Sequence, residues 1–297
     1  MPVIGNEIGL TLDQIMVATD FTPVSETATS YASALAKRYA SKLTVVNVVD
    51  LSVSTQSEKA LIGIPIDRMR HDSAENIEWV ANDLETVGVK AQGKSLEGHN
   101  PGSELLRFSE YLKTDLLVIG THSKTGLKKM ILGSFAEGVI HHANCPVLAV
   151  GPHVKPPTEV GLAFGTIVFA TDFRHSSVEK AGIALTFAQD SSAKIYMCHV
   201  LDHTPPDLTD SLDLQFKAEK GLSRLIPMAA FEWCNPECLV DFGDVPEHIL
   251  GLAQRVQADL IVLGARRSAT WRTHLTEGTV GQILSKSTCP VLTICTD

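Results

Sequence analysis

The sequence predicts an α/β fold made of two tandem doubly wound domains. Each is a Rossmann-like, five-stranded parallel sheet of strand order 3-2-1-4-5, and the two together form a pseudo-dimer. The first observation is a repeat, because residues 15–50 and 167–202 are two versions of one segment that starts IMVATDF and IVFATDF. Each half also closes on a matching pair, TDLLVIG with NCPVLAV and ADLIVLG with TCPVLTI. Within each half, apolar runs alternate with helical periodicity, as parallel βα units do. We expect domains at 1–151 and 162–297, joined by a proline-containing linker at 152–161.

The elements of the first half follow from apolar runs and helix-start signals. Thr22 is a good N-cap and Pro23 suits the first helical position, while Asn100 and Pro101 repeat that pair further on. The second half repeats the same order. The predicted strands are Ile15–Ala18, Leu43–Val49, Val89–Leu96, Leu116–Ile119 and Pro146–Val150, and further helices are predicted over about 67–87 and over Ile131–His142.

Composition narrows the class of protein. A hydrophobic content of 44% and 20% charged residues are typical of a soluble globular chain. The net charge of −9 argues against a nucleic-acid surface, and no apolar run reaches the roughly 18 residues of a membrane span. The first residues have no signal-peptide pattern, so we expect a cytoplasmic protein.

The six cysteines do not follow the repeat as a disulfide framework would. Cys145 and Cys289 hold equivalent positions before a strand, where packing is the first interpretation. Cys234 and Cys238 are four residues apart in the second half only, and a metal or redox pair stays open for them.

A ligand site is expected where the strand order reverses, beyond the carboxyl ends of the strands. Asp20 follows the first strand and Gly120 ends the fourth, so the order 3-2-1-4-5 brings both to one crevice. The following segment has glycines that let backbone amides approach a phosphate, then a helix start that adds partial positive charge. This segment also carries Lys124, Lys128 and Lys129. These lysines supply local positive charge for a phosphate or, as an alternative, form a solvated face.

On these residues the chain resembles the universal stress protein family, in its tandem form. The ATP-binding branch of that family has the pattern G-x2-G-x9-G-[ST], and this sequence has Gly120, then Ser123 in place of the second glycine, then Gly133 and Ser134. If a positive φ is needed at Ser123, a residue other than glycine costs about 1–2 kcal/mol, or about tenfold in affinity. The resemblance implies that Asp20 lies near adenine and ribose and that Val48 lines the base pocket. The full expected nucleotide-binding set is Thr19, Asp20, Val48, Gly120, Ser123, Gly133 and Ser134.

The second half departs further from the pattern. Gly264 matches Gly120, but Arg267 stands at the second glycine and Glu277 at the third, with Gly278 one place late. A carboxylate is electrostatically unsuited to a phosphate cradle, so we expect this half not to bind nucleotide. Asp172 remains as the counterpart of Asp20, and Arg266, Arg267 and Arg272 would suit another anion.

Structural alternatives stay open for the aspartates. Asp20 and Asp172 also suit turns in which the carboxylate accepts bonds from the following loop. Catalytic patterns fail: a Walker lysine does not follow Gly126, and neither G-x-S-x-G nor H-E-x-x-H occurs. We therefore expect no enzyme, with slow hydrolysis of bound ATP left open.

The functional hypothesis is a stress-response protein whose N-terminal domain binds ATP, with or without Mg²⁺, beside a non-binding C-terminal domain. The alternative is a nucleotide-free interaction scaffold that acts through protein partners, and a third is a small-molecule or metal sensor using Cys234, Cys238 and the second-half arginines. Family resemblance implies that the fifth strand, which carries CPVL, makes the contact between domains and is therefore an assembly surface. We therefore also expect a homodimer through the fifth strands, with no nucleic-acid or membrane partner.

Overall fold

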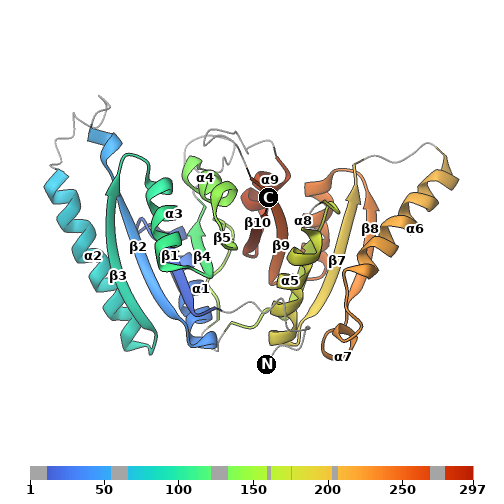
Figure 1. Ribbon diagram of the computed structural model, residues 1–297, viewed down its shortest axis with the longest axis horizontal. Coiled ribbons are helices and arrows are strands. Elements are labelled where there is room, and N and C mark those ends of the chain that lie inside the picture. Colours follow the sequence, from blue (N-terminus) through green and yellow to red (C-terminus); the bar gives the residue numbers. More distant parts are fainter. Residues whose placement is uncertain are drawn as a thin grey trace.

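Ten strands join into one continuous sheet (Figure 1). The computed structural model describes residues 12–54, 66–121, 133–158, 162–174, 176–202, 207–267 and 278–296. The strands run in the order β3-β2-β1-β4-β5-β10-β9-β6-β7-β8. Their bounds are β1 Gln14–Ala18, β2 Lys42–Asp50, β3 Lys90–Gly98, β4 Leu116–Gly120, β5 Val147–Val150, β6 Thr166–Ala170, β7 Lys194–Leu201, β8 Glu237–Phe242, β9 Leu260–Arg266 and β10 Val291–Thr296.

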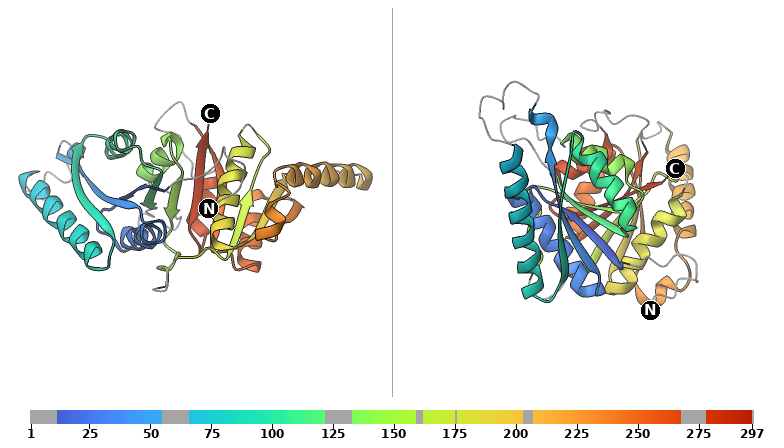
Figure 2. Two further views of the ribbon diagram at one scale, coloured as in Figure 1. Left: turned by 60° about the horizontal axis from the view of Figure 1, so that its bottom comes forward. Right: turned by 60° about the vertical axis from the view of Figure 1, so that its left-hand side comes forward.

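Helices cover both faces of the sheet (Figure 2). They are α1 Pro23–Tyr39, α2 Ile66–Thr86, α3 Pro101–Leu112, α4 Ser134–His142, α5 Ser177–Ser191, α6 Leu208–Arg224, α7 Ala230–Trp233, α8 Val245–Arg255 and α9 Thr279–Lys286, with a 3-10 turn at Leu51–Ser54. Strand side chains alternate between the layers. In β1, Ile15 and Val17 belong to the core that also contains residues of α1, α2 and α5, whereas Met16 and Ala18 belong to the core that also contains residues of α3, α4, α8 and α9. Two buried cores therefore flank one sheet, which confirms the predicted doubly wound architecture.

Each half has the predicted strand order, 3-2-1-4-5, and all pairings within a half are parallel. The halves meet at β5 and β10, which pair antiparallel with Leu148 opposite Leu292. Both edges of β5 are thus occupied within the chain, by β4 and by β10. The expected homodimer through the fifth strands is therefore corrected: this contact forms between the two halves of one chain, and no free edge of β5 is left for a second chain.

Local signals explain where the helices begin. The Thr22 side chain accepts a bond from the Ser25 amide at the start of α1, and the Asn100 side chain accepts one from the Ser103 amide at the start of α3. Both predicted N-caps are confirmed. The start of α4 was predicted too early, because Gly133 is extended (φ −68°, ψ 147°) and the helix begins at Ser134.

A second contact joins the halves away from the sheet. Arg38 Nε at the end of α1 lies 2.6 Å from Asp190 Oδ2 in α5, and the Tyr39 hydroxyl donates to the same oxygen at 2.8 Å. Arg38 Nη2 also donates to the Asp190 carbonyl at 2.6 Å. Among the described residues, no helix is both long and apolar enough to span a membrane.

Candidate functional site

The turn after β1 is held by the Thr19 and Ser25 side chains. Thr19 is buried, its amide donates to the Val46 carbonyl at 2.9 Å, and its hydroxyl shares a hydrogen bond with the Ser25 hydroxyl at 3.0 Å. The Thr19 hydroxyl also accepts a hydrogen bond from the Phe21 amide at 3.0 Å. Phe21 has φ +62°, a left-handed conformation that costs a residue other than glycine about 1–2 kcal/mol. The Thr19 side chain therefore supports a strained turn at the crevice.

Asn47 on β2, which was not among the predicted site residues, also holds this turn. Its Nδ2 donates to the Thr19 carbonyl at 2.7 Å, while its Oδ1 accepts from the Ser73 hydroxyl at 2.7 Å. The signal was present in the sequence, because Asn47 and Thr44 are the two polar residues in the run Leu43–Val49. Asn47 connects α2 to the end of β1.

Asp20 is exposed at the carboxyl end of β1, as predicted. Its Oδ1 accepts bonds from the Thr22 amide at 3.2 Å and from the Thr22 hydroxyl at 2.7 Å. This is the turn geometry of the structural interpretation. The same carboxylate sits at the edge where a ligand of β1 and β4 would lie.

Gly120 and Val48 face different layers. A Cβ atom added at Gly120 would lie 3.1 Å from the Ser25 amide nitrogen, so glycine is needed for the close approach of α1. Val48 is partly buried among the residues of the α3 and α4 layer. Gly120 thus lies against the backbone of α1 on one face of the sheet, and Val48 packs on the other face.

The N-terminus of α4 is the place where the sequence predicts that an anion binds. Gly133 is its N-cap and makes no side-chain capping bond, and Ser134 is exposed. Glu137 in the first turn is buried and was not among the predicted site residues. The other expected parts of this loop, Ser123, Gly126 and the three lysines Lys124, Lys128 and Lys129, lie outside the described residues.

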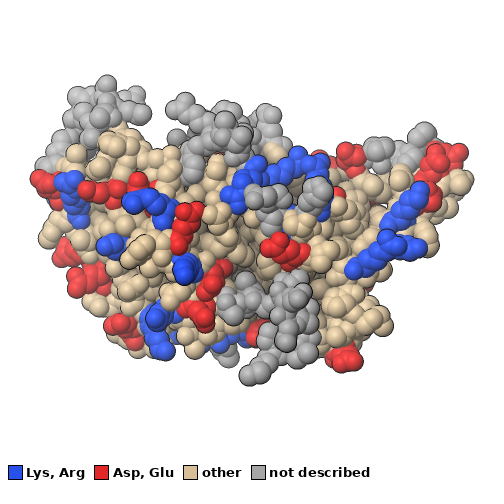
Figure 3. Space-filling model, viewed as in Figure 1, with Lys and Arg blue, Asp and Glu red and all other residues tan. Residues whose placement is uncertain are grey.

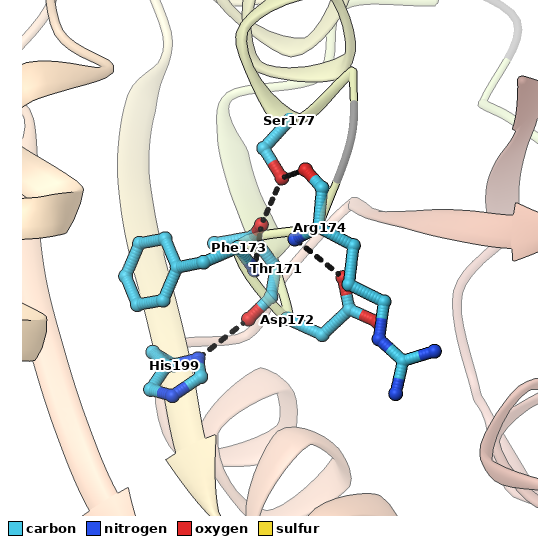
Figure 4. Close-up of polar contacts among 6 residues, drawn as sticks. All are labelled: Thr171, Asp172, Phe173, Arg174, Ser177 and His199. Atoms are coloured by element: carbon cyan, nitrogen blue, oxygen red, sulfur yellow. Dashed lines mark hydrogen bonds and ion pairs between the residues drawn. The ribbon is translucent and has the colours of Figure 1, made fainter.

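The second half repeats the turn (Figure 4). The Thr171 hydroxyl donates to Ser177 at 3.1 Å and accepts the Phe173 amide at 3.1 Å, and Phe173 has φ +55°. His199 takes the place of Asn47, with Nδ1 donating to the Thr171 carbonyl at 2.7 Å. Because both halves keep this arrangement, it is a property of the fold and does not distinguish a binding half from a non-binding half.

The aspartate of the second half is paired differently. Arg174 stands where the first half has Thr22, and its Nε lies 3.1 Å from Asp172 Oδ2 (Figure 4). The Arg174 amide also donates to Asp172 Oδ1 at 3.2 Å. The Asp172 carboxylate, which corresponds to that of Asp20, is therefore paired with a guanidinium.

Gly264 and the start of α9 also differ from their counterparts. The ammonium of Lys180 lies 2.9 Å from the point that a Cβ at Gly264 would occupy. Gly120 pairs with Val150, and Gly264 pairs with Ile294. The two halves therefore have the same number of residues between each glycine and its partner in the fifth strand. Yet α9 begins one residue later than α4, and its N-cap is Gly278 with no side-chain capping bond.

That later start changes the interpretation of the second half. Gly278 has the position at α9 that Gly133 has at α4, and Thr279 follows it as Ser134 follows Gly133. The glycine that the sequence places one residue late is therefore matched by a helix that also starts late. Glu277 and Arg272 lie outside the described residues. Arg267 Nη2 donates to Asn144 Oδ1 at 3.0 Å, across the boundary between the halves.

A groove of about 960 Å³ lies between α1 and α2, and Pro157, Thr158, Leu162 and Ala163 also line it. Phe21, Trp79 and Leu162 are among its apolar lining residues, with Lys37 and Asp83 among the charged ones. Thr19 opens onto this groove, on the α1 side of the sheet, whereas Val48 packs on the opposite side. Val48 is therefore not among the lining residues of this groove.

The cysteines are all free thiols. Burial raises the pKa of Cys234 to about 11 and also raises the pKa of Cys238. Protonated thiols are poor metal ligands and nucleophiles. Within the described residues no cluster of three potential metal ligands occurs, and the sensor hypothesis gains no support from this pair.

Comparison with known proteins gives one consistent family. A model of the universal stress protein family matches residues 11–151 and again 163–294. A universal stress protein of Methanocaldococcus jannaschii is 35% identical over 145 residues, which are 46% of this chain and 81% of that protein. A putative universal stress protein of Staphylococcus aureus is 30% identical over 148 residues, 50% of this chain and 89% of that protein. A universal stress protein structure from Archaeoglobus fulgidus has a TM-score of 0.73 at 20% identity, covering 97% of this chain and 98% of its own.

Proposed function

Because this chain belongs to the universal stress protein family, we propose that it is a stress-response protein whose N-terminal half binds an adenine nucleotide, ATP with Mg²⁺. The nucleotide would lie at the carboxyl edge of β1 and β4, with its phosphates at the start of α4. The six free thiols suit the reducing cytoplasm, where we place its action.

The uncapped start of α4 is the observation that carries this proposal. The helices α1, α3, α6 and α8 each have an N-terminal amide bonded to a side chain, from Thr22, Asn100, Asp207 and Asp244. Gly133 offers no such side chain to α4. The amides of a helix N-terminus carry partial positive charge and suit a phosphate. Ser134 adds an exposed hydroxyl beside them.

Binding, rather than chemistry, is the activity we propose. The described part of the crevice supplies backbone amides, one carboxylate and hydroxyls, and we nominate no nucleophile or general base among them. The second half offers an uncapped helix start of its own, but its aspartate is paired with Arg174. We therefore propose one nucleotide per chain.

Titration calorimetry of nucleotide-free protein with ATP and Mg²⁺ tests this function. We expect one site per chain. Gly133→Glu places a carboxylate at the phosphates and should weaken binding at least about tenfold, which is about 1.4 kcal/mol. The matched control is Gly278→Glu at the start of α9, which should leave the affinity unchanged. Ser123→Gly should tighten binding about tenfold if that position needs a positive φ.

The outcomes separate the alternatives. Two sites per chain, with one lost in each variant, would show that the second half binds as well. Equal loss from Gly133→Glu and Gly278→Glu at one site would contradict the assignment to α4. No binding at all would favour the interaction scaffold. That second candidate is favoured by the internal bonds that already engage the Thr19 hydroxyl and the Asp20 carboxylate.

A further inference from the structure

Helix α4, whose start is the proposed phosphate site, packs against strands of both halves. It contacts β5 of its own half and also β9 and β10 of the second half. Six of its nine residues are buried, from Ala136 to His141. The helix therefore lies in the boundary between the halves, and its position depends on both of them.

His141 in the last turn of α4 makes a buried contact across this boundary. The residue is only 8% exposed, and its Nδ1 is hydrogen-bonded to the carbonyl oxygen of Arg266, the last residue of β9. Since a carbonyl oxygen can only accept, Nδ1 is the donor. The other ring nitrogen, Nε2, is buried and has no partner within the described residues. In that part of the chain, the bond to Arg266 is therefore the polar contact that orients this ring.

Two more bonds link the same end of α4 to the second half. Arg267 Nη2 donates to Asn144 Oδ1 at 3.0 Å, and Asn144 Nδ2 donates to Glu110 Oε1 on α3 at 2.5 Å. The Cys295 thiol on β10 donates to the His141 carbonyl at 3.4 Å. Blue atoms gather in Figure 3 where Figure 1 draws α9 and the upper end of β9. Positive charge beside the carboxyl-terminal end of a helix is favourable, because the macrodipole leaves that end partly negative.

The corresponding helix of the second half, α9, makes a different contact. The matching segments NCPVL and TCPVL align His141 with Ser285 of α9. The Ser285 hydroxyl donates to the Gln282 carbonyl of its own helix at 2.9 Å. Helix α9 does approach the first half, since a Cβ atom at Gly151 would lie 2.8 Å from the Leu284 carbonyl oxygen, but that approach is between backbones. The bond from a side chain of the helix to the end of a strand in the other half is therefore a feature of α4 and not of the repeated fold.

We propose that the second half positions the phosphate-binding end of α4, with His141 as the positioning residue. The start of α4 lies about 10 Å from His141 along one continuous helix. A helix this short moves as a rigid unit, so the bond that fixes its last turn to β9 also fixes the direction of its first amides. This inference rests on the proposed nucleotide site. It gives the second half, which we propose binds no nucleotide, a part in binding by the first half.

Hydrogen exchange of the nucleotide-free full chain tests the positioning directly. His141→Leu removes the donor but keeps a side chain of similar size, and we expect faster exchange of the α4 amides. His141→Asn keeps a donor near the place of Nδ1 and should restore slow exchange. Ser285→Ala is the matched control on α9 and should leave α4 unchanged. Unchanged exchange of α4 in His141→Leu overturns the proposal. If that variant does not fold, unchanged exchange in Arg267→Ala overturns it, since Arg267 is exposed and its replacement leaves the core intact.

Titration calorimetry with ATP and Mg²⁺ separates positioning from general stability. His141→Leu should weaken binding about 2–30-fold, and His141→Asn should restore it. Leu222→Ala is the stability control, because Leu222 is fully buried in α6, outside α4, and its loss should lower the melting temperature with the affinity unchanged. Equal affinity of wild type and His141→Leu, or an equal loss in Leu222→Ala, contradicts the proposal. Wild type that binds no nucleotide refutes the proposed function instead, and the exchange of α4 then decides the positioning alone.

Discussion

Replacing Gly120 by alanine separates the structural role of this glycine from its expected role in binding. A Cβ atom here would lie 3.1 Å from the Ser25 nitrogen and 3.2 Å from both Ser25 Cα and Val24 C. Ordinary contacts of carbon atoms are about 3.5–4.0 Å. All three neighbours belong to the backbone at the start of α1, so relief requires that α1 move away from β4.

The expected cost follows from this crowding. Overpacking of a buried site typically destabilises by about 1–3 kcal/mol. At roughly 2–4 °C per kcal/mol for domains of 150–250 residues, the melting temperature of Gly120→Ala should fall by several degrees. Gly251→Ala is the matched control, since Gly251 lies on the exposed side of α8 with no atom within 4 Å of its added Cβ. Alanine is favoured over glycine inside a helix by about 1 kcal/mol, so this control should be slightly stabilised.

Differential scanning calorimetry of both variants gives the comparison, and nucleotide titration of the folded proteins follows. A melting temperature for Gly120→Ala equal to or above that of Gly251→Ala would refute the packing argument. An unchanged melting temperature with lost nucleotide binding would instead assign Gly120 to the ligand alone.

Three further predictions concern packing and titration. Leu148→Ala opens a cavity opposite Leu292 at the junction of the halves and should cost about 2–5 kcal/mol in urea unfolding; a loss below 1 kcal/mol would contradict tight packing there. Asp190→Ala removes the carboxylate shared by Arg38 and Tyr39, and because that pair is partly exposed it should cost about 1 kcal/mol or less. A larger loss would show that this contact holds the halves together. Burial raises the pKa of Tyr31 from 10.0 to about 12, so the stability from its neutral phenol is complete below pH 10 and lost as the pH rises towards 12. Tyr31→Phe should flatten that part of the curve of melting temperature against pH, and an unchanged curve would exclude Tyr31 as its source.

The parts of the fold that follow from local chemistry could be predicted. The repeat and the alternation of strands and helices predicted a doubly wound parallel sheet in each half, the expected order 3-2-1-4-5 is confirmed, and Thr22 and Asn100 marked their helices. The start of α4 could not be located from apolar periodicity. Ile131 and Leu132 continue the helical pattern, and only the extended conformation of Gly133 ends it.

Two features of the candidate site depend on backbone geometry that residue spacing in the sequence does not indicate. The Arg174 side chain reaches Asp172 around a turn in which Phe173 has a positive φ, a conformation that its residue type disfavours. Counting from Gly264 placed Glu277 at the third glycine, but the helix start moved with Gly278. Residue numbers along a loop cannot show where the next helix begins. For Ser123 and Glu277 the expectations stay predictions.

Because β5 and β10 pair within one chain, their contact does not depend on protein concentration. Two separate copies joined in this way would part on dilution, whereas halves on one polypeptide meet at an effective concentration that is set by the linker and independent of expression level. In a homodimer, every substitution appears on both sides of the contact, because both subunits have the same sequence. In this chain the two halves have separate sequences, so a substitution changes one side of the contact only. Arg174 could arise in one half while the other kept Thr22, so covalent linkage frees one half to specialise without loss of the other.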